Sequence, residues 1–110
     1  MEKTQYTNEK QIKEITNEWE DLINELSHKE LALYEWKTLY NARSEEIINN
    51  TDFKELYGKN NDKVRKDYVK KELQDWYNII KDLEFSIDHI QRRISFLKAM
   101  TYVKMGGIDV

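Results

Sequence analysis

Two histidines and one carboxylate are the residues closest to a metal-binding pattern. His28 follows Glu25 by three positions, the Glu-x-x-His spacing that carboxylate-bridged metal sites use on paired helices. The second histidine, His89, has Ser86 at the corresponding position, so the second half of the pattern is missing. A Glu-rich helix produces one half of this pattern by chance. We therefore expect solvated histidines, no metal and no other cofactor.

Patterns for catalysis are also missing from the sequence. The chain has no cysteine, so it has no thiol nucleophile, no disulfide and no zinc–thiolate site. It has no Gly-x-Ser-x-Gly elbow and no glycine-rich phosphate loop. Neighbouring carboxylates such as Glu45 and Glu46 point to different sides of a helix. We therefore expect a protein that is not an enzyme.

Basic side chains with aromatic neighbours gather in the middle of the chain and are the main candidates for binding. Such cations can contact phosphates while the rings stack on bases, or both can contact a protein partner. Asp62, Asp67 and Glu72 dilute the positive charge of this stretch, and the net charge of the whole chain is −3. The cluster comprises Phe53, Tyr57, Lys59, Lys63, Arg65, Lys66, Lys70 and Lys71.

An apolar stripe from Val69 to Leu97 must position these residues. Its side chains recur at alternating spacings of four and three, a heptad pattern that predicts a helix packed against another helix. A second stripe, from Ile12 to Ile47, predicts the partner helix. The first stripe consists of Val69, Leu73, Trp76, Ile80, Leu83, Ile87, Ile90, Ile94 and Leu97.

The two stripes predict one all-α domain over residues 1–110, an antiparallel, coiled-coil-like helical hairpin. The chain has no proline and three glycines, which favours long helices. We expect helix one over about residues 8–48 and helix two over about residues 62–104. The antiparallel arrangement brings Trp19 near Ile90.

A polar turn, at about residues 49–61, is expected to join the helices. Asn49 and Asn50 should end helix one because asparagine competes for backbone hydrogen bonds. The turn is expected to hold a short helix, Asp52–Tyr57, with Gly58 at its end.

Apolar side chains also lie off the stripes, where a two-helix hairpin cannot cover them. Large exposed apolar patches usually indicate association. We therefore expect a homo-oligomer, with a dimer favoured, built as a helical bundle. The interface residues we assign are Tyr34, Leu39, Tyr77, Ile79, Phe85, Phe96 and Met100.

The apolar content of the sequence does not favour a membrane location. No apolar run approaches the length of a membrane span, and the first residues lack the apolar stretch of a secretory signal. The lack of cysteine fits a reducing compartment. We expect a cytoplasmic protein with no membrane contact.

The segment Asn50–Leu56, followed by Asn61–Val69, resembles a pattern in small helical accessory proteins of Firmicutes phages and prophages. Those proteins tend to be encoded in early regions, beside recombination and replication functions. The resemblance implies a phage-type accessory protein in the host cytoplasm and implies no catalytic residue.

Three functions remain open from the sequence. In the first, the chain binds and modulates a host or phage protein, for example by inhibiting a host defence or nuclease. In the second, it is an accessory DNA-binding protein of phage recombination or replication. In the third, it is a purely structural coiled-coil assembly protein.

Overall fold

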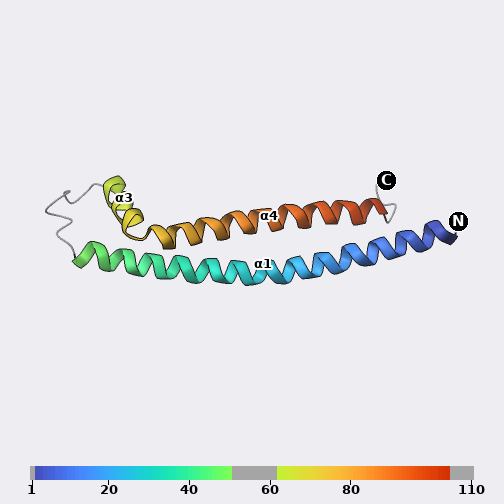
Figure 1. The fold of residues 1–110 in the computed structure, drawn as a ribbon, viewed down its shortest axis with the longest axis horizontal. Helices are drawn as coiled ribbons and strands as arrows, with labels where there is room; N and C mark the ends of the chain where they lie inside the picture. Colours follow the sequence, from blue (N-terminus) through green and yellow to red (C-terminus); the bar gives the residue numbers. More distant parts are fainter. Residues whose placement is uncertain (1, 51–61, 105–110) are drawn as a thin grey trace. The chain divides into compact units, whose positions relative to one another are not determined.

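The computed structural model describes residues 2–50 and 62–104, and all of these residues except Leu73 lie in α-helices. Helix α1 comprises Glu2–Asn50, α3 comprises Asp62–Glu72, and α4 comprises Gln74–Lys104 (Figure 1). Within these ranges there is no β-strand. The predicted all-α antiparallel hairpin is confirmed, since α1 packs against α4 with the short helix α3 between them in the sequence.

The helix ends differ from the predicted ones at the start of the chain. Helix α1 begins at Glu2 rather than near residue 8, and it ends at Asn50, close to the predicted end. The early start has a simple cause, because no proline or glycine precedes residue 8 to stop the helix. The predicted short helix over residues 52–57 lies outside the described residues.

The prediction of one unbroken helix over residues 62–104 is wrong, because the helix is interrupted at Leu73. Two backbone hydrogen bonds still span the interruption: Leu73 N donates to Val69 O at 2.8 Å, and Tyr77 N donates to Leu73 O at 2.9 Å. Helix α3 turns away from the axis of α4 (Figure 1), yet the backbone N–H and carbonyl of Leu73 both keep a hydrogen-bond partner.

The bend at Leu73 is not caused by a helix-breaking residue, and it leaves the core side chains buried. No proline or glycine lies between residues 62 and 104, so the usual helix-breaking residues are excluded as its cause. Val69 and Leu73 are both buried despite the bend. The heptad pattern fixed which side chains are buried, but it did not fix a straight axis.

The chain divides into two compact units, each of which takes one part of α1 and one part of α4. Unit 1 comprises residues 1–30 with 85–110, and unit 2 comprises residues 31–84, including α3.

In unit 1, α1 and α4 are joined by a charged pair beside an apolar core. Ile87, Ile90 and Leu97 are the buried side chains. Arg93 donates to Glu18 through two hydrogen bonds, Nε to Oε1 at 2.8 Å and Nη2 to Oε2 at 3.2 Å. Glu18 directly precedes Trp19, and Arg93 follows Ile90 by about one helical turn. The pair therefore agrees with the predicted register, which brings Trp19 near Ile90.

In unit 2, two tryptophans make the central contact between α1 and α4. The rings of Trp36 and Trp76 meet edge to face, with centroids 5.7 Å apart and an interplanar angle of 77°. This geometry suits the quadrupoles of aromatic rings. Val69, Leu73 and Ile80 are buried in the same unit.

The buried side chains all come from one half of the hairpin. Among residues 9–49 and 62–104, no side chain of α1 is buried, whereas six members of the predicted stripe over residues 69–97 are buried. The other three stripe members, Trp76, Leu83 and Ile94, are half-buried. The stripe is thus confirmed as the core. The core is thin because one helix can cover only one face of another.

Removal of the most buried side chain should test this core. Leu97 is 1% exposed, so Leu97→Ala should lower the free energy of unfolding by about 2–5 kcal/mol. Leu31 is 57% exposed, and the matched variant Leu31→Ala should change it by no more than about 0.5 kcal/mol. Urea unfolding followed by circular dichroism, at one protein concentration, measures both. Equal losses in the two variants would contradict this account of the core.

The Glu18–Arg93 pair makes a second prediction. The pKa of Glu18 is lowered, chiefly by the hydrogen bond from Arg93, with a smaller effect of its charge, while desolvation opposes both. The pair should therefore stabilise the fold above the ordinary pKa of glutamate, and this stabilisation should be lost as pH falls through the lowered pKa. Arg93→Gln should raise the pKa of Glu18, as measured by NMR titration.

The neighbouring arginine provides the control for this titration. Arg92 pairs with Asp88 at 2.9 Å on the same helix, so Arg92→Gln should leave the pKa of Glu18 unchanged. A similar rise in both variants would show that general charge, rather than the pair, sets the pKa.

Candidate functional site

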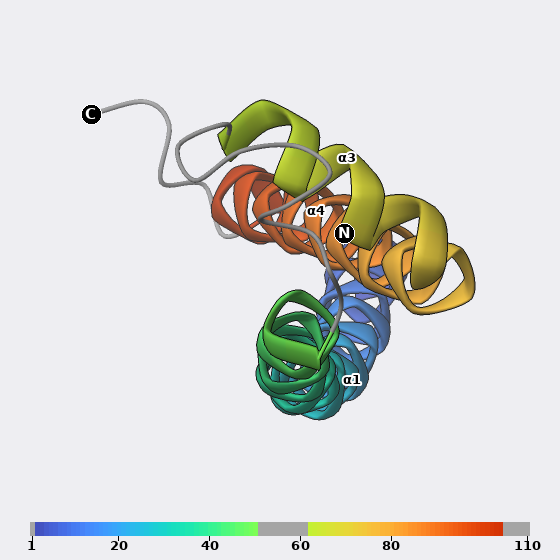
Figure 2. The ribbon, with the colours of Figure 1, turned by 90° about the vertical axis from the view of Figure 1, so that its left-hand side faces the viewer.

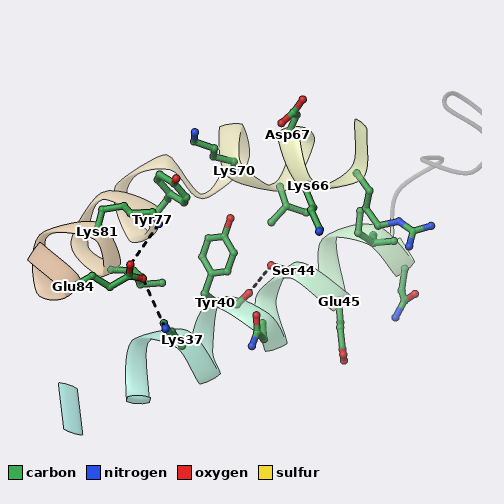
Figure 3. Close-up of a pocket in the computed structure, with 16 residues that line it drawn as sticks. Lys37, Tyr40, Ser44, Glu45, Lys66, Asp67, Lys70, Tyr77, Lys81 and Glu84 are labelled. Carbon is green, nitrogen blue, oxygen red and sulfur yellow. Dashed lines mark hydrogen bonds and ion pairs between the residues drawn. The ribbon is translucent and has the colours of Figure 1, made fainter. Parts of the chain in front are cut away.

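A groove of about 830 Å³ lies in unit 2, between the last part of α1 on one side and α3 with the start of α4 on the other (Figure 3). Helix α3, which contributes one wall of the groove, bends away from the axis of α4 (Figures 1 and 2). Its volume is in the range of pockets that bind small ligands or the side chains of a partner. The lining residues that matter below are Lys37, Tyr40, Glu45, Ile48, Arg65, Lys66, Asp67, Val69, Lys70, Tyr77, Ile80, Lys81 and Glu84.

The base of the groove is apolar. Val69 and Ile80 are buried, and Ile48 is half-buried. The rings of Tyr40 and Tyr77 add aromatic surface, and Figure 3 shows the Tyr40 ring standing up from α1 into the space between the helices. An apolar or aromatic group of a ligand would therefore lose contact with water here.

The charged side chains around this base, which we call the rim of the groove, are mostly positive. Five cationic side chains and three carboxylates line the groove. In Figure 3, Lys66 reaches into the space from α3, whereas Glu45 and Asp67 point away from it. The remaining carboxylate, Glu84, is shared by two lysines: its oxygens lie 3.8 Å from Lys37 Nζ and 3.5 Å from Lys81 Nζ. The groove therefore favours a ligand that carries negative charge.

Two of the lysines also contact an aromatic ring. Lys70 Nζ lies 4.4 Å from the centroid of the Tyr77 ring, and Lys81 Nζ lies 5.4 Å from it. Cations at this distance are attracted by the electron-rich face of the ring. The Tyr77 ring thus contacts two of the lysines at the rim, Lys70 and Lys81.

The pKa of Tyr40, a residue that lines the groove, departs from its ordinary value. Its pKa is raised, first by burial and second by the neighbouring charge of an ionised Tyr77. Like any tyrosine hydroxyl at neutral pH, that of Tyr40 is protonated and can donate a hydrogen bond to an anionic ligand. Its backbone carbonyl accepts a hydrogen bond from Ser44 Oγ at 2.6 Å.

The predicted basic cluster is only partly reproduced at the groove. Arg65, Lys66 and Lys70 line it, while Lys63 and Lys71 are exposed on α3 outside the lining. The other predicted members, Phe53, Tyr57 and Lys59, lie outside the described residues.

Sequence reasoning missed the members of the site that come from other helices. Lys37 and Tyr40 come from α1, and Lys81 and Glu84 come from α4. The antiparallel register places these segments in one unit, so the register itself was a usable signal. The bend at Leu73 that opens the groove had no signal in the sequence.

The residues predicted for an oligomer interface are divided between the two units. Tyr34, Leu39, Tyr77 and Ile79 belong to unit 2, while Phe85, Phe96 and Met100 belong to unit 1. Four of the seven are exposed, and the other three are half-buried. The half-buried ones are Tyr77, Ile79 and Met100.

The Glu-x-x-His spacing is occupied by local contacts. Glu25 pairs with Lys29 at 3.9 Å, and Nδ1 of His28 donates to the backbone carbonyl of Asn24 at 2.8 Å. His89 is exposed. In the part of the chain that the structure describes, no three histidine, aspartate or glutamate side chains are close enough to hold a metal ion.

Comparison with known proteins adds no relative. No protein-family model matches the chain, and neither the curated proteins nor the solved structures contain a match to it. In the described ranges, none of the three helices has the length together with the apolar character that crossing a membrane requires.

The raised pKa of Tyr40 should respond to changes in its two causes. Tyr77→Phe removes the smaller cause, the charge of the ionised neighbour, and should lower the pKa of Tyr40 only part of the way to its ordinary value. NMR titration of labelled tyrosine measures this shift. Tyr34→Phe, at an exposed tyrosine of the same unit, is the control and should leave the pKa of Tyr40 unchanged. A full return to the ordinary value in Tyr77→Phe would mean that burial is not the main cause.

Proposed function

We propose that this chain is a non-enzymatic, phage-type interaction protein that binds and modulates a host or phage protein in the host cytoplasm. Inhibition of a host defence or nuclease is one such role. The observation that carries the proposal is the groove of unit 2, with its apolar base and cationic rim. It fits an acidic segment of a partner that inserts apolar side chains.

The geometry favours binding over chemistry. The described residues that line the groove include no histidine, and the Ser44 hydroxyl is engaged by a backbone carbonyl rather than by a base. A groove between helices is a common receptor for an amphipathic helix of a partner. Complementary charge at the rim speeds association and selects the partner.

A capture experiment with charge-reversed variants tests the proposal. Lys66→Glu with Lys70→Glu reverses two cations of the groove, both exposed. The tagged chain should recover a protein from host lysate, and this double variant should recover at least tenfold less of it, since each lost contact to a charge is worth about 1.5–3 kcal/mol. Quantitative mass spectrometry measures the recovery.

The control has the same change in charge on unit 1. Lys13→Glu with Lys98→Glu alters two exposed lysines away from the groove and should recover the partner as the unaltered chain does. Recovery of no protein, or equal recovery by both double variants, would count against the proposal.

DNA binding is the second candidate, because α3 presents an unusual number of exposed cations. Lys63, Lys66, Lys70 and Lys71 are all exposed on this short helix. A protein that neutralises several phosphates binds less tightly as salt increases, because counterions are released on binding. The same surface could therefore serve an accessory role in phage recombination or replication.

A salt series of gel shifts decides this candidate. Single-stranded and duplex DNA should shift at low salt, and changing the four α3 lysines to glutamate should abolish the shift. The same number of changes to exposed acids elsewhere, Glu20, Glu30, Glu35 and Glu46 to Gln, should not weaken it. Failure to shift any DNA at low salt would remove the candidate.

We also propose that the chain self-associates, most simply as a dimer. Exposed large apolar side chains occur in both units, and association would cover some of them. Self-association with no other ligand is the behaviour of a structural assembly protein, the third function open from the sequence.

A further inference from the structure

We propose that one face of α4 in unit 1 binds the same face of a second copy of this chain, with the two helices antiparallel. This inference rests on the proposed self-association and assigns its surface and geometry. The face, which we call the outer stripe, consists of Phe85, His89, Arg92, Phe96, Ala99 and Val103.

The outer stripe is exposed along its whole length. All six residues are exposed, and its three largest apolar side chains are 75% exposed at Phe85, 50% at Phe96 and 55% at Val103. The buried residues of the same segment, Ile87, Ile90 and Leu97, point to the opposite side of the helix, where α1 packs. Helix α1 therefore leaves the outer stripe uncovered.

The spacing of the outer stripe is that of a helix–helix contact. Its members follow one another at four, three, four, three and four residues, the heptad spacing that the buried stripe also has. Helix α4 thus carries two such stripes on opposite faces. The structure supplies a neighbour for one of them.

This order of spacings is the same in both directions, so the stripe can pair with itself antiparallel about a two-fold axis. In that alignment Phe85 faces Val103, His89 faces Ala99, and Arg92 faces Phe96 of the second copy. Each large side chain then faces a smaller one or a group that attracts it. A symmetric dimer needs this kind of self-complementary surface.

Charge also selects the antiparallel alignment. A parallel alignment in register would place Arg92 against Arg92, and like charges in contact are unfavourable. The antiparallel alignment places Arg92 against the ring of Phe96. That ring already accepts a guanidinium, since Arg93 lies 5.1 Å from its centroid within one chain. A second cation on the other face of the ring extends the same interaction.

Cysteine cross-linking tests the alignment, because the chain has no cysteine of its own. In the double variant His89→Cys with Ala99→Cys, the two thiols of one chain are ten residues apart on a helix, about 15 Å. A disulfide cannot span that distance, so only pairing between two copies can form one. The double variant should run as a cross-linked dimer after mild oxidation.

The two single variants are the controls for direction. Neither His89→Cys nor Ala99→Cys should cross-link, because each new thiol faces the unaltered residue of the second copy. Cross-linking of a single variant as efficient as that of the double variant would indicate a parallel pair and would overturn the proposal. No cross-linking of the double variant would overturn it as well.

Light scattering coupled to size exclusion tests the surface. The unaltered chain should have the mass of a dimer, and Phe96→Glu should have the mass of a monomer with unchanged helicity. Tyr34→Glu, at a residue 70% exposed on unit 2, should remain a dimer.

These masses separate the two proposals. A monomeric unaltered chain would overturn self-association and the outer stripe together. A dimer that survives Phe96→Glu, or that is lost with Tyr34→Glu, would overturn the outer stripe alone. Capture of a protein partner through the groove of unit 2 is measured independently and stands or falls without either result.

Discussion

A helix can cover only one face of another helix, and this constraint determines which side chains of the molecule are buried and which are exposed. In the described residues, the buried side chains are six members of one stripe over residues 69–97. The side chains of α1 over residues 9–49 are at most half-buried. Because so few residues form the core, each of them carries a large share of the stability. For the same reason, several large apolar side chains stay in contact with water, and these are the surfaces available for association.

The bend at Leu73 adds a groove to this simple packing. A straight continuation of α4 would keep α3 alongside α1, whereas the bend separates the two and leaves a groove between them. Val69 remains buried at its base, while Lys66 and Lys70 stay exposed. Glu84 forms ion pairs with Lys37 and Lys81, and the Tyr77 ring contacts Lys70 and Lys81. The groove thus combines an apolar base with a rim whose cations are already positioned.

The sequence predicted the fold well and the site poorly, for different physical reasons. Heptad spacing can be read from the sequence of a single helix, so the side chains from Val69 to Leu97 could be recognised as a buried stripe. The hairpin could then be inferred from this stripe and the second one on α1. No proline or glycine lies near Leu73 to indicate the break there. The basic residues of α3 were recognisable as a cluster, but Lys37, Tyr40 and Glu84 join them only through the antiparallel register. The direction of a dimer, likewise, becomes arguable only once exposure along α4 is known.

The distance along the chain between contacting residues has a consequence for how the hairpin forms. Trp36 meets Trp76 across forty residues, while Glu18 meets Arg93 across 75. Closing a longer loop loses more chain entropy, so we expect the tryptophan pair to form first and the charged pair to follow, in the manner of a zipper. During synthesis, the first half of α1 then has no helix to pack against until Arg93 and its neighbours have left the ribosome. The apolar residues of the first half of α1 therefore remain accessible to chaperones for most of translation.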